Sequence, residues 1–119
     1  MDTSGARVER LIESYRSAAL AHGEATSSGD HELANRHHDT VAEIYRELRS
    51  HGRSVQMALL PLLADPADAV RAWSAAHALE FSPERGEAVL TDLAQGGGGF
   101  AFNARMTLRE WQAGRLSFP

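Results

Sequence analysis

The sequence predicts an all-α fold of about six helices, arranged as a small right-handed α-solenoid. Apolar residues recur with helical spacing along most of the chain. No stretch alternates apolar and polar residues with the β-branched enrichment that is typical of strands. In addition, the apolar positions of residues 58–81 recur thirty residues later, which indicates a repeated helical hairpin.

The first part of the chain is expected to form an antiparallel helical hairpin. An apolar stripe with helical spacing covers residues 6–22, and the turn formers of residues 23–30 interrupt it. A second stripe covers residues 33–48. Asp30 is the predicted N-cap of the second helix, and Gly52 is the predicted glycine at its C-terminal end.

Shorter helices are predicted for the rest of the chain, in the segments RSVQMALLPLLA, DPADAVRAWSAAHALEF, SPERGEAVLTDLAQ and GGFAFNARMTLREWQAG. Pro66 and Pro83 suit the first turn of a helix, and Asp65 and Ser82 suit the caps before them. The four glycines at 96–99 predict a loop.

Shifting residues 58–81 by thirty positions aligns apolar with apolar residues, for example Leu60 with Leu90 and Phe81 with Trp111. Surface positions do not coincide, as expected of repeats in which only the buried positions are constrained. We therefore expect a single domain, 1–119, with an N-terminal hairpin (5–52), two repeat units (53–81 and 82–114) and a C-terminal tail (115–119).

Composition excludes several classes of protein. Twelve arginines and no lysine against sixteen acidic residues give a net charge of -4, which disfavours nucleic acid as a partner. Cysteine is absent, and no apolar run approaches the roughly twenty residues of a membrane span. The N-terminal residues lack the continuous apolar stretch of a signal peptide. We expect a cytoplasmic protein without membrane contact.

The segment PLLADPADAVRAWSAAHAL resembles a HEAT repeat. Pro61 lies near the end of the first helix of the unit, Asp65 in the turn and Arg71 at the start of the second helix. The second unit departs from this pattern, with Gln95 and Ala101 where the Asp and Arg would be. The resemblance implies a stack of HEAT-like hairpins without the Asp–Arg ladder of longer arrays.

The whole chain is also similar to a bacterial family of short HEAT-like proteins, through SGDHELANRHHD, IYRELRSHG, AHALEFSPERGEAVL and the closing MTLREW. Members of such families are often encoded beside toxin genes, where a cytoplasmic partner neutralises the toxin. The resemblance therefore implies an immunity protein that occludes a cognate toxin domain. A general scaffold or regulatory adaptor of the same fold is the alternative.

A solenoid of this kind offers a concave face lined by the second helix of each unit. The acidic balance of the chain would favour a basic partner, such as a nuclease toxin. The predicted partner-binding residues on these second helices are Arg71, Trp73, Ser74, His77, Asn103, Thr107 and Glu110.

No catalytic, cofactor-binding or metal-binding residues are predicted. His31, His37 and His38 cluster in sequence but lack the i, i+4 histidine pair of helical zinc sites. His37 falls on an apolar stripe, where a hydrogen-bonded core histidine is expected. The glycine run lacks the Lys-Ser/Thr of a phosphate loop. A binding protein is expected, and a small metal-dependent enzyme built around His31 and His38 is the remaining alternative.

Overall fold

The computed structural model describes residues 5–119 and is all-helical, with no strand in that range. The predicted all-α fold with six α-helices is confirmed, with one 3₁₀ helix in addition. The described residues form two compact units, one that ends at Leu59 and includes Pro119, and one that spans Leu60–Phe118. The helices are α1 (Gly5–Ser28), α2 (His31–Ser50), α3 (Arg53–Gln56), η1 (Met57–Ala64), α4 (Asp68–Phe81), α5 (Pro83–Gln95) and α6 (Ala101–Gln112).

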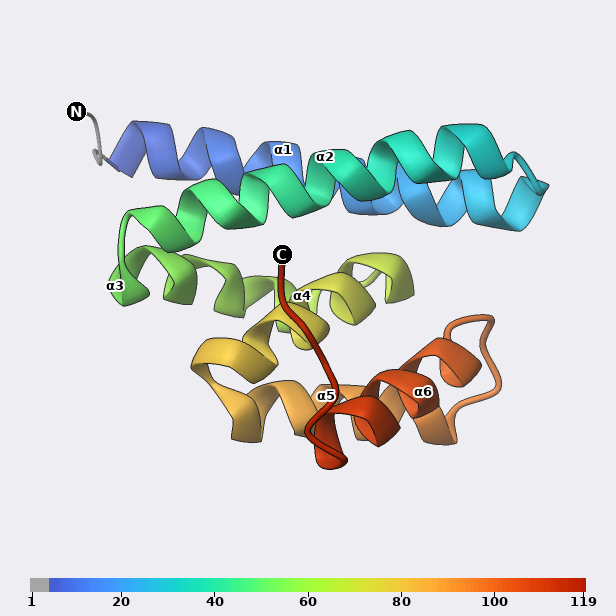
Figure 1. The fold of residues 1–119 in the computed structure, drawn as a ribbon. Coiled ribbons are helices and arrows are strands. Elements are labelled where there is room, and N and C mark those ends of the chain that lie inside the picture. Colours follow the sequence, from blue (N-terminus) through green and yellow to red (C-terminus); the bar gives the residue numbers. More distant parts are fainter. Residues whose placement is uncertain (1–4) are drawn as a thin grey trace. The chain divides into compact units, whose positions relative to one another are not determined.

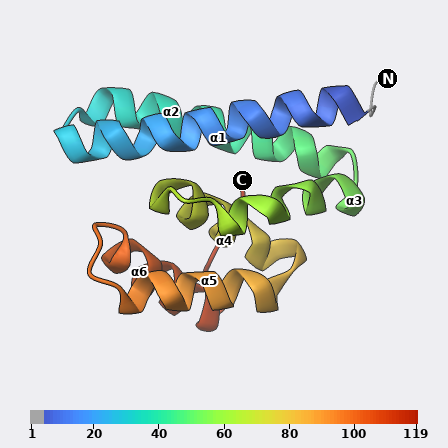
Figure 2. The ribbon, with the colours of Figure 1, turned by 180° about the vertical axis from the view of Figure 1, so that it is seen from behind.

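The first unit is built on the antiparallel hairpin of α1 and α2 (Figures 1 and 2). Each helix turns an apolar stripe inward, and the hydrophobic effect of that burial stabilises the pair. Tyr45 belongs to this core, and its hydroxyl accepts a hydrogen bond of 2.9 Å from the Gln56 side chain of α3. Five side chains of the hairpin have no exposed surface: Tyr15, Ala19, Val41, Tyr45 and Leu48.

The first helix is longer than predicted, because it continues to Ser28 instead of ending at His22. Gly23 and Ala25 are buried, so packing outweighs the low helix propensity of glycine, about 1 kcal/mol. The turn follows at Gly29, whose φ is 79°. The predicted cap is confirmed, since the Asp30 carboxylate accepts a hydrogen bond of 3.1 Å from the backbone N–H of Leu33.

The segment predicted as one helix after Gly52 is split into α3 and η1. Pro61 lies inside η1 and has no N–H to donate, which disfavours an α-helix at this point. Gly52, which follows the C-cap His51 of α2, has a positive φ of 105°, which glycine adopts readily.

In the second unit, α5 packs against both α4 and α6 (Figure 1). Gly86 of α5 is buried where α4 approaches closely, and a Cβ at this position would lie 2.6 Å from the carbonyl oxygen of Ala75. Pro83 opens α5 as predicted. The glycines of 96–99 form the predicted loop between α5 and α6.

One predicted boundary and one predicted capping bond in this unit differ from the structure. Asp65 and Pro66 lie before the start of α4, because the Asp65 carboxylate accepts a hydrogen bond of 2.9 Å from the N–H of Ala67 and forms a turn there. Ser82 occupies the N-cap position of α5, but its side chain makes no capping hydrogen bond. No helix within residues 5–119 has the length and hydropathy to cross a membrane.

Candidate protein interface

The predicted binding residues of α4 are largely inside the protein. Ser74 is fully buried and His77 is 4% exposed, so their predicted position on the surface is wrong. The Ser74 hydroxyl donates to the carbonyl oxygen of Val70 at 2.8 Å, which satisfies it within the helix and allows its burial. Both side chains were predicted to lie on the surface because they are polar, and this criterion was not sufficient.

Arg71 and Trp73 are half-buried. The Arg71 guanidinium pairs with Asp68 one turn earlier on α4, and its Nε is buried with no hydrogen-bond partner among the described residues. The Trp73 ring lies 5.7 Å from the ring of His77, measured between centroids. Both residues thus have partners within α4, and only part of each is open to another molecule.

The predicted residues of α6 are more accessible. Asn103 is exposed, and Thr107 and Glu110 are half-buried. Arg115 donates two hydrogen bonds to the Glu110 carboxylate, at 2.8 and 3.2 Å. These bonds are the main cause of the lowered pKa of Glu110. Desolvation opposes them, and the charges of Arg115 and then Arg109 lower the pKa further. The negative charge of Glu110 is therefore held by the arginine that follows the helix.

The structure also exposes two large apolar side chains of α6 that are not among the residues predicted from the sequence. Phe102 is 62% exposed and Met106 is 37% exposed, one turn apart on the same helix. The opposite side of α6 packs inward through Ala101 and Ala104. Exposed aromatic and methionine side chains on a packed helix are more typical of interfaces than of ordinary surface.

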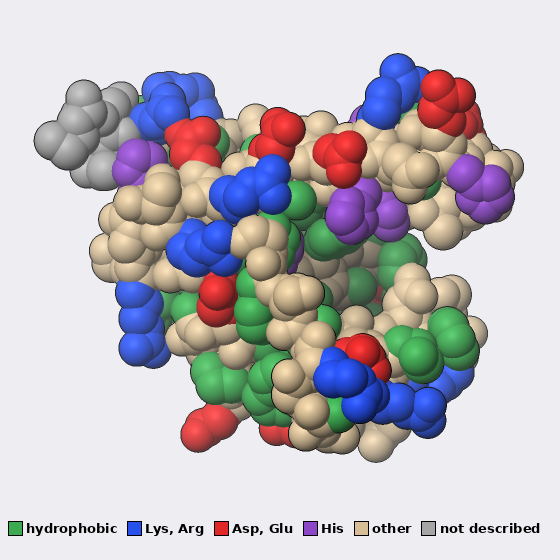
Figure 3. All heavy atoms as spheres, viewed as in Figure 1, with side chains coloured by type: hydrophobic (Ala, Val, Ile, Leu, Met, Phe, Trp, Pro, Cys, Tyr) green, Lys and Arg blue, Asp and Glu red, His purple; other side chains and the backbone are tan. Residues whose placement is uncertain are grey.

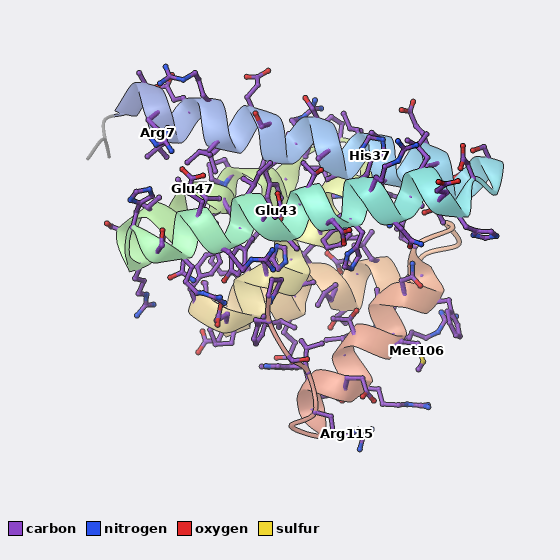
Figure 4. All side chains as sticks on the ribbon, turned by 45° about the horizontal axis from the view of Figure 1, so that its top comes forward. Arg7, His37, Glu43, Glu47, Met106 and Arg115 are labelled. Atoms are coloured by element: carbon purple, nitrogen blue, oxygen red, sulfur yellow. The ribbon has the colours of Figure 1, made fainter. Side chains whose placement is uncertain are left out.

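Two arginines flank these apolar residues. Successive residues of an α-helix are about 100° apart, which places Phe102, Met106 and Arg109 within about 60° of one another and Arg105 at their edge. All four are exposed, and we refer to them as the α6 face. Figure 3 shows hydrophobic and arginine side chains next to each other over α6, and Figure 4 shows Met106 pointing outward from this helix.

One arginine of the α6 face is hydrogen-bonded to the backbone of α5. Arg105 donates a hydrogen bond of 3.0 Å to the carbonyl oxygen of Ala94, in the last turn of α5, and so binds a neutral acceptor. Glu110, the acidic residue of α6, is bonded to Arg115. The α6 face is therefore basic and apolar in a chain whose net charge is -4.

A half-open cavity of about 170 Å³ lies in the second unit beside the glycine loop. Asp68, Arg71 and Asp92 supply its charged groups. A Cβ at Gly98 would lie 3.1 Å from the Asp68 carboxylate, so glycine fits the wall closely. The cavity is smaller than the roughly 300–1,000 Å³ of most small-molecule sites.

The clustered histidines of the first unit are at least partly exposed. His31 and His38 are exposed and His37 is half-buried, which corrects the expectation of a core histidine at 37 (Figure 4). His22 of α1 lies 6.2 Å from His38, between ring centroids. Within residues 5–119, no group of three or more histidine and carboxylate side chains is arranged to hold a metal ion.

Residues 9–112 match the family described as a domain of unknown function, DUF2019. The chain belongs to the DUF2019 family. The match runs from α1 to the end of α6 and includes all four residues of the α6 face. No curated protein matches the chain.

The fold of this DUF2019 chain is similar to that of a protein from Rhodopseudomonas palustris CGA009, known from a crystal structure. The TM-score is 0.88 at 22% sequence identity, and the alignment covers 100% of this chain and 99% of that chain. At this identity the similarity supports the DUF2019 fold and carries no residue roles.

Proposed function

We propose that this DUF2019 chain is a protein-binding module that contacts its partner through the α6 face. More specifically, we propose a cytoplasmic immunity protein that neutralises a cognate bacterial toxin by covering it. The observation that carries the proposal is the 62% exposure of Phe102 on a helix whose other side is packed. The chain would act by binding alone, without a cofactor and without catalysis.

The composition of the α6 face supports a protein partner. Aromatic residues, methionine and arginine are enriched at protein interfaces, and a few such residues usually carry most of the binding energy. Phe102 and Met106 would be desolvated on binding, while Arg105 and Arg109 would pair with acceptors on the partner. About 800 Å² per partner makes a stable interface, and a patch centred on these residues is a suitable core for one.

Occlusion is the mechanism that such a surface favours. A HEAT-like arrangement of the helices, as the sequence resemblance implies, would hold α6 rigid and present its face without rearrangement. A rigid face loses little conformational entropy when it binds, which favours a tight complex. Neither nucleic acid nor membrane is part of the proposal.

A toxicity assay in bacteria tests the proposed function. A candidate toxin domain is expressed with the wild-type chain or with Phe102→Ser plus Met106→Ser. We expect protection by the wild type and its loss in the double variant, because the buried apolar contacts are removed. Met57→Ser is the matched control, since Met57 is 41% exposed on η1 and lies outside the α6 face.

Circular dichroism and thermal unfolding establish that each variant is folded. Full protection by a folded Phe102→Ser, Met106→Ser variant would contradict the role of the α6 face. Failure of the wild type to protect against any candidate toxin, together with stable binding of a housekeeping protein, would instead favour the adaptor.

A further inference from the structure

We propose that the α6 face binds an acidic segment of its partner that carries at least one large apolar residue. This inference rests on the proposed function. The charge that it assigns to the bound segment is opposite to the charge that the net charge of the whole chain would favour in a partner. The sequence as a whole, at -4, favours a basic partner. The local charge on α6 favours an acidic one.

The local charge is consistent along the C-terminal part of the chain. Residues 96–119 contain three arginines and one acidic residue, Glu110. Glu110 is bonded to Arg115, which leaves Arg105 and Arg109 as the charges next to Phe102 and Met106. A partner segment on the α6 face would therefore meet two positive charges.

Because salt screens distant charges, the charges on the α6 face determine which partner segment is attracted to it. At physiological ionic strength the Debye length is about 8 Å, so exposed charges farther from a bound segment contribute little. Arg105 and Arg109 lie on the same helix surface as the apolar pair and would be within that distance of any segment that contacts it. A guanidinium also accepts a carboxylate in bidentate geometry, which fixes the register of the segment.

The apolar pair sets the second requirement on the partner. Phe102 and Met106 are one helical turn apart. Their apolar surface would stay partly exposed to water in the complex unless an apolar side chain of the partner covered both. A purely acidic segment would pair with the two arginines but would leave the apolar surface of Phe102 and Met106 in contact with water. The partner segment that fits both features is amphipathic, with an aromatic or long aliphatic residue next to aspartate or glutamate.

Selection from a random phage-displayed peptide library on the full chain tests this inference and does not require the natural partner. Counter-selection against Arg105→Glu plus Arg109→Glu keeps only peptides that need the two arginines. We expect recovered peptides to be rich in acidic residues beside an aromatic or aliphatic residue. Basic recovered sequences, or no enrichment over the charge-reversed variant, would overturn the inference.

Titration calorimetry with a synthetic copy of a recovered peptide then measures how much the two arginines contribute to the affinity. Arg105→Glu plus Arg109→Glu should weaken binding at least about tenfold, because two attractions become repulsions. Arg36→Glu plus Arg85→Glu is the matched control, since both arginines are exposed, both lie outside α6 and the change in net charge is the same. We expect less than about a twofold change in the control, because its charges are screened. Equal weakening in the two double variants would also overturn the inference.

The two proposals fail in distinguishable ways. Protection by the Phe102→Ser, Met106→Ser variant would contradict the proposed function, whereas peptide selection would still show what the α6 face binds. Loss of protection in that variant, with recovery of basic peptides only, would retain the function and reject the acidic partner segment.

Discussion

Helices α4 and α6 occupy corresponding positions when the chain is shifted by thirty residues, yet they differ in what they expose. Ala72 and Ala76 of α4 are half-buried, and the corresponding residues of α6 are Phe102 and Met106, which are exposed. Ser74 of α4 and its counterpart Ala104 of α6 are both buried. The two helices thus share a buried position, but Ala75 and Leu79 of α4 are buried where the corresponding Arg105 and Arg109 of α6 are exposed.

This difference distinguishes two roles that an apolar residue can have in a helix. At the shared buried position, Ser74 and Ala104, a small side chain contributes to close packing of the helix. A large apolar side chain at an outward position is not required for the fold and lowers solubility, so its presence suggests a binding role. The comparison therefore shows that α4 is mostly buried and supports the proposal that α6 contacts a partner.

The largest expected effect is on the free energy of unfolding when apolar atoms are removed from α4. Leu79 is 4% exposed, and Leu79→Ala should destabilise the protein by about 2–5 kcal/mol because it leaves a cavity. Met106→Ala on α6 should change stability by less than about 0.5 kcal/mol. Urea unfolding measures both, and a destabilised Met106→Ala variant would mean that α6 uses this side chain for packing.

An intermediate effect is expected where α4 and α5 approach each other. In Gly86→Ala the new Cβ would lie 2.6 Å from the Ala75 carbonyl oxygen and 3.0 Å from the Leu79 nitrogen, so the helices must move apart. We expect a loss of about 1–3 kcal/mol. This loss would occur although alanine is the better helix former by about 1 kcal/mol.

Gly97→Ala is the matched control for that substitution. A Cβ at Gly97 has no heavy atom within 4 Å, apart from its chain neighbours, so this variant should be as stable as the wild type. Thermal unfolding compares the two variants. Equal stability of Gly86→Ala and wild type would show that the close contact between α4 and α5 is not maintained in solution.

Local signals in the sequence predicted the helical fold well, because they act within one turn of a helix. Asp30 caps α2, Pro83 opens α5 and Gly52 takes a positive φ, each as expected from the chemistry of the residue itself. The predicted end of α1 was wrong because the burial of Gly23 depends on tertiary packing. The predicted exposure of Ser74 was wrong for the same reason, since a hydroxyl bonded to its own helix can be buried.

The candidate interface was only partly predictable. Helix α6 was expected to present a surface, but its polar residues were predicted to bind and Phe102 and Met106 were not. The thirty-residue shift that pairs Ala72 with Phe102 contained the missing signal, namely a large apolar residue where the other unit has a small one. Net charge summed over the whole chain conceals the basic character of the C-terminal helix.

The smallest expected effect concerns the charge on α6. Because hydrogen bonds from Arg115 are the main reason for the lowered pKa of Glu110, Arg115→Gln should raise that pKa towards its ordinary value, and Arg109→Gln should raise it less. NMR titration of the glutamate carboxyl carbon measures both shifts. The folded pKa is below the unfolded one, so the stability that this pair contributes is complete above the unfolded pKa and is lost as the pH falls through the folded pKa.

The ranking of the two variants decides how the α6 face is charged. If Arg115→Gln gives the larger shift, Glu110 is held by Arg115, and Arg109 remains available to a carboxylate of the partner. If Arg109→Gln gives the larger shift, Glu110 neutralises Arg109, and the α6 face has one available positive charge instead of two. In that case the comparison with α4 would rest on the exposed Phe102 and Met106 alone, and an acidic partner segment would lose half of its electrostatic support.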